Sequence, residues 1–114
     1  MVAMTVHTSE GDIIAVDEKH CETSSVLKSA LYHENGHCAT GMFYDKSSSV
    51  YFKMRCEYIA DKYVANNWIT KEMIEKAHKE EGIEYIWEFA EYFNITIEYM
   101  KRIFYIHFQT EFPD

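Results

Sequence analysis

Apolar residues recur at helical spacing along most of this 114-residue chain, and that periodicity restricts the fold more than any other feature. It predicts helices over residues 24–39, 50–66, 70–81, 83–93 and 96–107. Residues that commonly cap helices stand at these boundaries: Thr23, Gly41, Thr70, Gly82, Asn94 and Thr96. The apolar stripes run through Leu27, Ala30 and Leu31, then Met54, Ile59, Ala60, Tyr63 and Val64, then Ile86, Phe89, Ala90 and Phe93, and finally Ile97, Met100, Ile103, Phe104 and His107.

The first 16 residues follow a different pattern. Two short β-prone runs flank a turn at residues 9–12, which predicts a β-hairpin over residues 3–16. Residues 45–49 lack periodicity and contain three serines, so we expect an exposed loop there. The predicted fold class is α+β: a small antiparallel sheet packed on a mainly helical body that ends in a helical hairpin.

The chain is expected to form one domain. Its length fits a single core, and its 47% of hydrophobic residues argues against intrinsic disorder. The one proline is Pro113, so no internal linker is marked. Within the domain 1–114, residues 1–69 would carry the hairpin and the first two helices, and residues 70–114 the C-terminal helical part.

Charge argues against direct binding of nucleic acid. The net charge of −8 repels phosphate backbones. The last two predicted helices resemble a helix-turn-helix pair, but residues 82–114 contain six acidic residues against Lys101 and Arg102. We therefore interpret the pair as packing that closes the core. Salt-sensitive binding to DNA would be expected if it read an operator instead.

From other features we expect a cytoplasmic protein. The longest aliphatic run, residues 13–16, is far shorter than the roughly 20 residues of a membrane span, and no signal-peptide pattern opens the sequence. The three cysteines, Cys21, Cys38 and Cys56, form an odd set without a CxxC pair. They are expected to be reduced and to act as small buried hydrophobes.

The most informative motif is the HExxH sequence His33-Glu34-Asn35-Gly36-His37, inside the first predicted helix. Positions four apart on a helix differ by about 40° in azimuth, so both imidazoles face the same way and can bind one zinc ion. Glu34 lies about 100° away, beside such a metal rather than on it. From there it can act as general base for a water molecule and pass the proton to a leaving amine.

A second helix supplies the remaining groups that a catalytic zinc site needs. Glu57 can complete a two-histidine, one-glutamate ligand set. Asp61, one turn later, can accept a hydrogen bond from Nδ1 of a zinc-binding histidine. Taken singly, each of these residues would be interpreted as an ordinary surface group. Together, the two motifs predict a metal site.

Residues outside the two motifs give weaker signals. The other four histidines, His7, His20, His78 and His107, have no partner spacing and are left unassigned. The candidates to stabilise an oxyanion are Tyr44, Tyr51 and Tyr58, with packing as the alternative role for each.

The motifs resemble the ImmA/IrrE family of metallopeptidases. Residues 31–37, 57–65 and 86–96 carry the likeness, which extends over about residues 13–108. The resemblance implies a small zinc protease that cleaves a helix-turn-helix repressor and so derepresses phage, mobile-element or stress genes. It implies His33, His37 and Glu57 as zinc ligands and Glu34 as catalytic acid/base. Asn35 departs from the family pattern, in which this position is usually apolar.

We therefore expect a zinc-dependent endopeptidase with one zinc ion per chain and a protein substrate. Mn²⁺ or Fe²⁺ can also occupy such an N₂O site. The alternative is a metal-binding antirepressor that sequesters a repressor without cutting it, with its acidic residues imitating DNA phosphates. Formation of a stoichiometric complex without fragments would separate this alternative from proteolysis. The sequence does not define the oligomeric state.

Overall fold

The computed structural model describes residues 3–16 and 23–109, and in this part of the chain the fold is α+β. A two-stranded antiparallel sheet is formed by β1 (Ala3–Thr8) and β2 (Gly11–Val16). Five helices follow: α1 (Ser24–Thr40), α2 (Val50–Asn67), α3 (Lys71–Glu81), α4 (Ile86–Phe93) and α5 (Ile97–Phe108). The predicted hairpin, loop and helix order are confirmed.

The helix boundaries follow from local chemistry. Thr23, Thr70 and Thr96 each accept a hydrogen bond from a backbone N–H in the first turn of α1, α3 and α5, and so satisfy donors that lack helical partners. Gly41 ends α1 in the left-handed region with φ 68°, where glycine carries no Cβ penalty. The predicted helix over residues 83–93 is too long at its start, because Tyr85 is the N-cap of α4.

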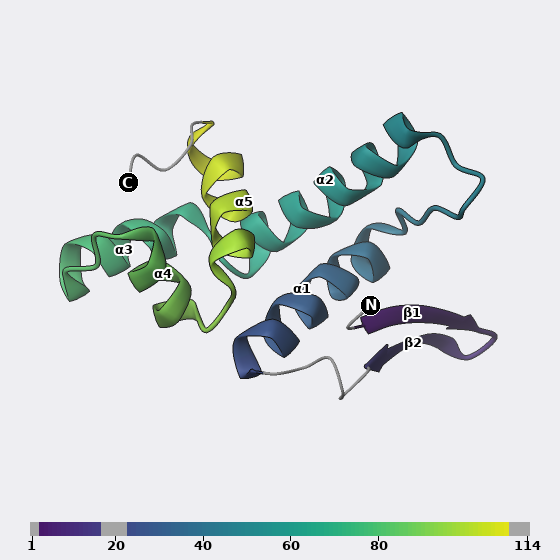
Figure 1. Ribbon diagram of the computed structural model, residues 1–114, viewed down its shortest axis with the longest axis horizontal. Coiled ribbons are helices and arrows are strands. Elements are labelled where there is room, and N and C mark those ends of the chain that lie inside the picture. Colours follow the sequence, from purple (N-terminus) through teal and green to yellow (C-terminus); the bar gives the residue numbers. More distant parts are fainter. Residues whose placement is uncertain (1–2, 17–22, 110–114) are drawn as a thin grey trace.

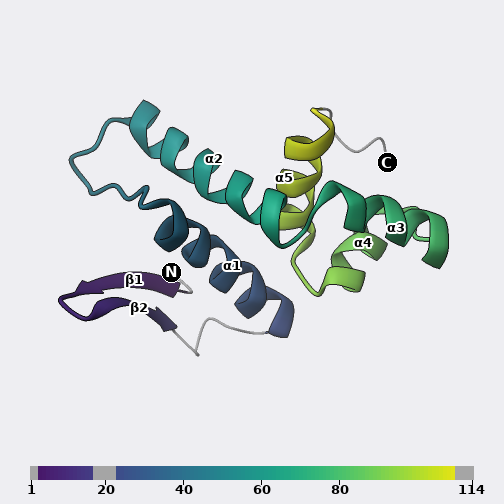
Figure 2. The ribbon, with the colours of Figure 1, turned by 180° about the vertical axis from the view of Figure 1, so that it is seen from behind.

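The site elements lie on one side of the helical body. In Figures 1 and 2, α1 and α2 run antiparallel and side by side, and the hairpin lies along the other flank of α1. Helices α3, α4 and α5 gather at the end of the molecule away from the hairpin. The small sheet therefore packs on the helical body through α1, as predicted.

The core joins the C-terminal half of α2 to α3, α4 and α5. Its largest fully buried members are Val64, Ile69, Met100 and Ile103. All four residues of the predicted α4 stripe are buried. Two residues of the predicted stripes are exposed to solvent: Met54 is 67% exposed and Ile97 is 42% exposed. Ile97 is the first residue of α5 and Met54 the fifth residue of α2, so both exposed residues lie near the start of their helices.

The cysteine prediction is confirmed in part. Cys56 is fully buried in α2, and Cys38 is half-buried on α1. Cys21 and His20 lie outside the described residues. No helix in the described part of the chain combines the length and the hydropathy that a membrane span needs.

Candidate metal centre

Helix α1 presents the two motif histidines toward each other, as the four-residue spacing predicts. His33 Nε2 and His37 Nε2 lie 3.2 Å apart, with the two rings nearly perpendicular. The His37 side chain is 6% exposed and that of His33 20% exposed. The pair is therefore partly withdrawn from solvent.

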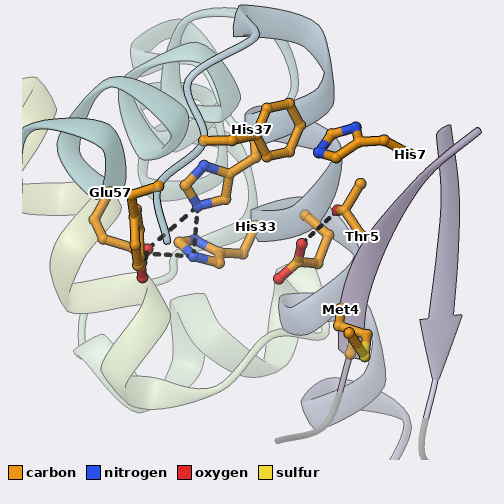
Figure 3. A pocket seen from close by; sticks show the side chains of 10 residues that line it. Met4, Thr5, His7, His33, His37 and Glu57 are labelled. Atoms are coloured by element: carbon orange, nitrogen blue, oxygen red, sulfur yellow. Dashed lines mark hydrogen bonds and ion pairs between the residues drawn. The ribbon is translucent and has the colours of Figure 1, made fainter. Parts of the chain in front are cut away.

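Helix α2 brings Glu57 to the same point. Its carboxylate oxygens lie 2.6 Å from His33 Nε2 and 3.3 Å from His37 Nε2 (Figure 3). Tyr44, from the loop before α2, donates a hydrogen bond of 2.5 Å to the same carboxylate. Three ligand atoms from two helices thus converge, although 20 positions separate His37 from Glu57 in the sequence.

The two helices approach closely because of a glycine inside the HExxH motif. A Cβ built on Gly36 would lie 2.5 Å from the carbonyl oxygen of Ala60 and 3.0 Å from its carbonyl carbon. Gly36 and Ala60 are both buried, and each is small enough for one helix backbone to rest on the other. This contact sets the distance between the histidines on α1 and the carboxylate on α2.

Hydrogen bonds from outside the cluster orient both imidazoles. His33 Nδ1 lies 3.0 Å from Asp61 Oδ1, as predicted for Asp61, and His37 Nδ1 donates to the backbone carbonyl of Met42. With Nδ1 so engaged, each ring directs Nε2 toward Glu57. The other Asp61 oxygen accepts from Nε and Nη2 of Arg102 on α5, so this buried carboxylate is paired on both sides.

His33, His37 and Glu57 form a group that can hold a metal ion. Their ligand atoms all lie within 4.8 Å of one another. Two imidazole nitrogens and one carboxylate oxygen are donors that suit divalent transition metals, and three protein ligands leave a coordination position open. The donor set therefore fits the expected metal.

The electrostatics of this cluster favour charged groups. Burial disfavours the charged form of His33, but its hydrogen bonds to Asp61 and Glu57 outweigh that cost and raise its pKa from 6.5 to about 9. Burial likewise opposes ionisation of Glu57, yet its histidine and tyrosine partners hold its pKa well below the usual value. The hydrogen bond to Glu57 raises the pKa of Tyr44 to about 12.

A cleft of about 490 Å³ opens over the cluster, with β1 as its opposite wall. Glu34 borders it beside His33, and Glu34 Oε2 accepts a hydrogen bond of 2.6 Å from Thr5 on β1. One carboxylate oxygen is thereby held, and the other is free of any hydrogen bond within the described residues. Figure 3 shows Thr5 and His7 on the strand that faces the histidine pair.

The structure unites all five predicted site residues: four, namely His33, Glu34, His37 and Glu57, line the cleft, and Asp61 lies behind His33. Of the three tyrosine candidates, Tyr44 lines the cleft, whereas Tyr51 and Tyr58 are exposed and are absent from its lining. His78 and His107 bond to backbone carbonyls away from it. Sequence reasoning missed Thr5, His7 and Arg102. The alternation of side chains along β1 places Thr5 and His7 on the same face of the strand, and this pattern could have indicated both residues.

The pKa of His33 predicts proton release on metal binding. Without metal His33 is protonated at about pH 7, and a histidine must be neutral to coordinate, so zinc has to displace that proton. We expect zinc titration calorimetry in buffers of different ionisation enthalpy to report about one proton or more released at about pH 7, falling toward pH 9. Apparent affinity should weaken as pH falls. An affinity that is flat between about pH 6.5 and 8.5 would contradict the protonation of His33.

The raised pKa of His33 also predicts how the stability of chelator-treated, metal-free protein depends on pH. Because the pKa of His33 is higher in the folded state than in the unfolded state, protonated His33 stabilises the fold. This stabilisation is complete below pH 6.5 and is lost as the pH rises toward about 9. Denaturant unfolding in a chelator should show this decline. It should be weaker in the Asp61→Asn variant, which lacks a charged partner of His33.

Comparison of the chain with protein-family models, with curated proteins and with solved structures finds no match.

Proposed function

We propose that this chain is a zinc-dependent endopeptidase of the zincin type. The observation that carries the proposal is the convergence of His33, His37 and Glu57 at a cleft that Glu34 also borders. A structural metal site would be closed by a fourth protein ligand, and here the described residues supply three. The open position and the neighbouring carboxylate favour hydrolysis over a purely structural role.

Zinc bound by this group would supply a Lewis acid that polarises a carbonyl and lowers the pKa of water. Glu34 would then take the proton from the attacking water and return it to the leaving amine. Thr5 holds one Glu34 oxygen at 2.6 Å, which fixes the carboxylate beside the ligands and leaves its other oxygen to receive the proton. Asp61 and the Met42 carbonyl keep both histidine Nε2 atoms directed at the metal position.

The resemblance to the ImmA/IrrE metallopeptidases supports a substrate class. Glu34 and Gly36 stand between the two histidines, and Ala60 and Asp61 follow Glu57 at the spacing of that family's motifs. We therefore propose that the substrate is a helix-turn-helix repressor and that its cleavage derepresses the genes it holds off. The chain's net charge of −8 suits contact with a basic DNA-binding protein rather than with DNA.

The test is incubation of zinc-loaded protein with the helix-turn-helix repressor encoded nearest to its gene, followed by intact-mass analysis. We expect two fragments whose masses sum to the repressor plus one water, no fragments in excess chelator, and recovery on adding zinc. A stoichiometric complex without fragments would instead establish the antirepressor alternative. Absence of both fragments and complex would contradict the proposed substrate class.

A further inference from the structure

The cleft-facing side of β1 carries a histidine that neither motif includes. Residues 3, 5 and 7 alternate onto one face of the strand, and all three line the cleft. His7 pairs directly with Asp12 on β2 in the antiparallel register, so their side chains lie on the same face of the sheet. His7 Nδ1 and Asp12 Oδ1 are 2.7 Å apart.

The His7 ring is held in place at the cleft. It meets the Phe43 ring edge-on with centroids 4.3 Å apart, and Phe43 in turn stacks on His37 at 5.9 Å. One aromatic ring thus separates His7 from a candidate metal ligand. Figure 3 shows His7 reaching from β1 toward His37, across the cleft from Glu57. Its side chain remains 54% exposed, so a bound molecule can contact it.

Among the side chains that line the cleft, the hydrogen-bond donors are already engaged, with one exception. Thr5 donates to Glu34 and Tyr44 donates to Glu57. The Nε2 atoms of His33 and His37 face each other and Glu57. His7 Nε2 has no hydrogen-bond partner among the described residues, and the described lining contains no lysine or arginine.

Peptide hydrolysis builds negative charge on the carbonyl oxygen of the bond being cut, and a preorganised donor at that oxygen lowers the barrier. A histidine whose Nδ1 is bound to a carboxylate is fixed in orientation, and its doubly protonated form donates from Nε2. From these observations we propose that His7, oriented by Asp12, donates a hydrogen bond from Nε2 to the carbonyl oxygen of the bond that is cleaved. This inference rests on the proposed endopeptidase function.

The experiment compares the zinc-loaded parent with His7→Ala and Asp12→Asn. His78→Ala is the matched control, because His78 also bonds through Nδ1 but lies outside the cleft. Zinc content and circular dichroism are measured first. In cleavage of the repressor, we expect His7→Ala to lower kcat by about 10²–10³-fold with KM little changed, as for loss of an oxyanion donor. Asp12→Asn should lower kcat less, and His78→Ala should equal the parent.

A binding measurement supplies a readout besides activity. N-phosphoryl-Leu-Phe carries a tetrahedral anion, whereas N-acetyl-Leu-Phe carries a planar neutral group. His7→Ala should weaken binding of the phosphoryl dipeptide and leave binding of the acetyl dipeptide as in the parent. An active parent with an equally active His7→Ala variant overturns this inference alone. Lost zinc in His7→Ala also overturns it, in favour of a structural role. A parent that neither cuts the repressor nor binds the phosphoryl dipeptide overturns the proposed function as well.

Discussion

The Gly36→Ala substitution is expected to destabilise the fold and weaken metal binding together. The added Cβ would meet two backbone atoms of Ala60 at 2.5 and 3.0 Å, and a helix backbone cannot move aside as a side chain can. Alanine gains about 1 kcal/mol of helix propensity over glycine, but forced overpacking costs about 1–3 kcal/mol, and more where backbone is struck. The cost of the clash therefore exceeds the gain in helix propensity, and α1 and α2 must move apart.

Separation of the helices moves Glu57 away from the histidine pair. We therefore expect zinc affinity to fall at least about tenfold, which is the size of effect seen when metal ligands lose their orientation. Denaturant midpoints and competition with a chromophoric chelator measure the two effects. Asn35→Ala is the matched control, because Asn35 is exposed on the same helix and should leave both quantities near those of the parent. Parent-like zinc affinity in Gly36→Ala would mean that the helix contact does not set the site.

The Glu34→Gln substitution should strongly reduce the rate of cleavage and leave zinc binding intact. Glutamine keeps the size of the side chain and can still accept the Thr5 hydrogen bond, but it cannot take a proton. Loss of a general base lowers the rate by about 10²–10⁴-fold. Repressor cleavage followed by mass spectrometry, together with the zinc content of the same sample, tests this.

Thr5→Val serves as the comparison for Glu34→Gln. It removes the hydrogen bond that positions Glu34 but leaves the carboxylate, so it should reduce the rate by a smaller factor. Full cleavage by zinc-loaded Glu34→Gln would show that Glu34 is not the base.

Local signals were sufficient to predict the secondary structure. Thr70 and Thr96 cap helices through their own hydroxyls, and Gly82 and Asn94 end helices in the left-handed region, so each boundary depends on a few neighbouring residues. The errors in predicted burial arose where tertiary context decides. Met54 fits an apolar stripe by spacing, but no described element packs over that side of α2. Periodicity reports which residues share a face and not what covers that face.

The residues of the candidate metal site could also be predicted from local spacing. The four-residue spacings of His33 with His37 and of Glu57 with Asp61 fix which groups share a helix face. Only the assembled fold brings Arg102 of α5 to Asp61, across 41 positions in sequence, and Thr5 of β1 to Glu34. No spacing rule links such residues, because their proximity depends on how the hairpin and α5 pack on α1 and α2.

We expect His33, His37 and Glu57 to bind a single metal ion. The most direct test is elemental mass spectrometry of the purified chain beside His33→Ala, with His107→Ala as a histidine control outside the cleft. We expect about one zinc per chain in the parent and the control, and essentially none in His33→Ala, as for loss of one of three zinc ligands. Well-folded parent protein that holds no metal and takes up none from added zinc would contradict it.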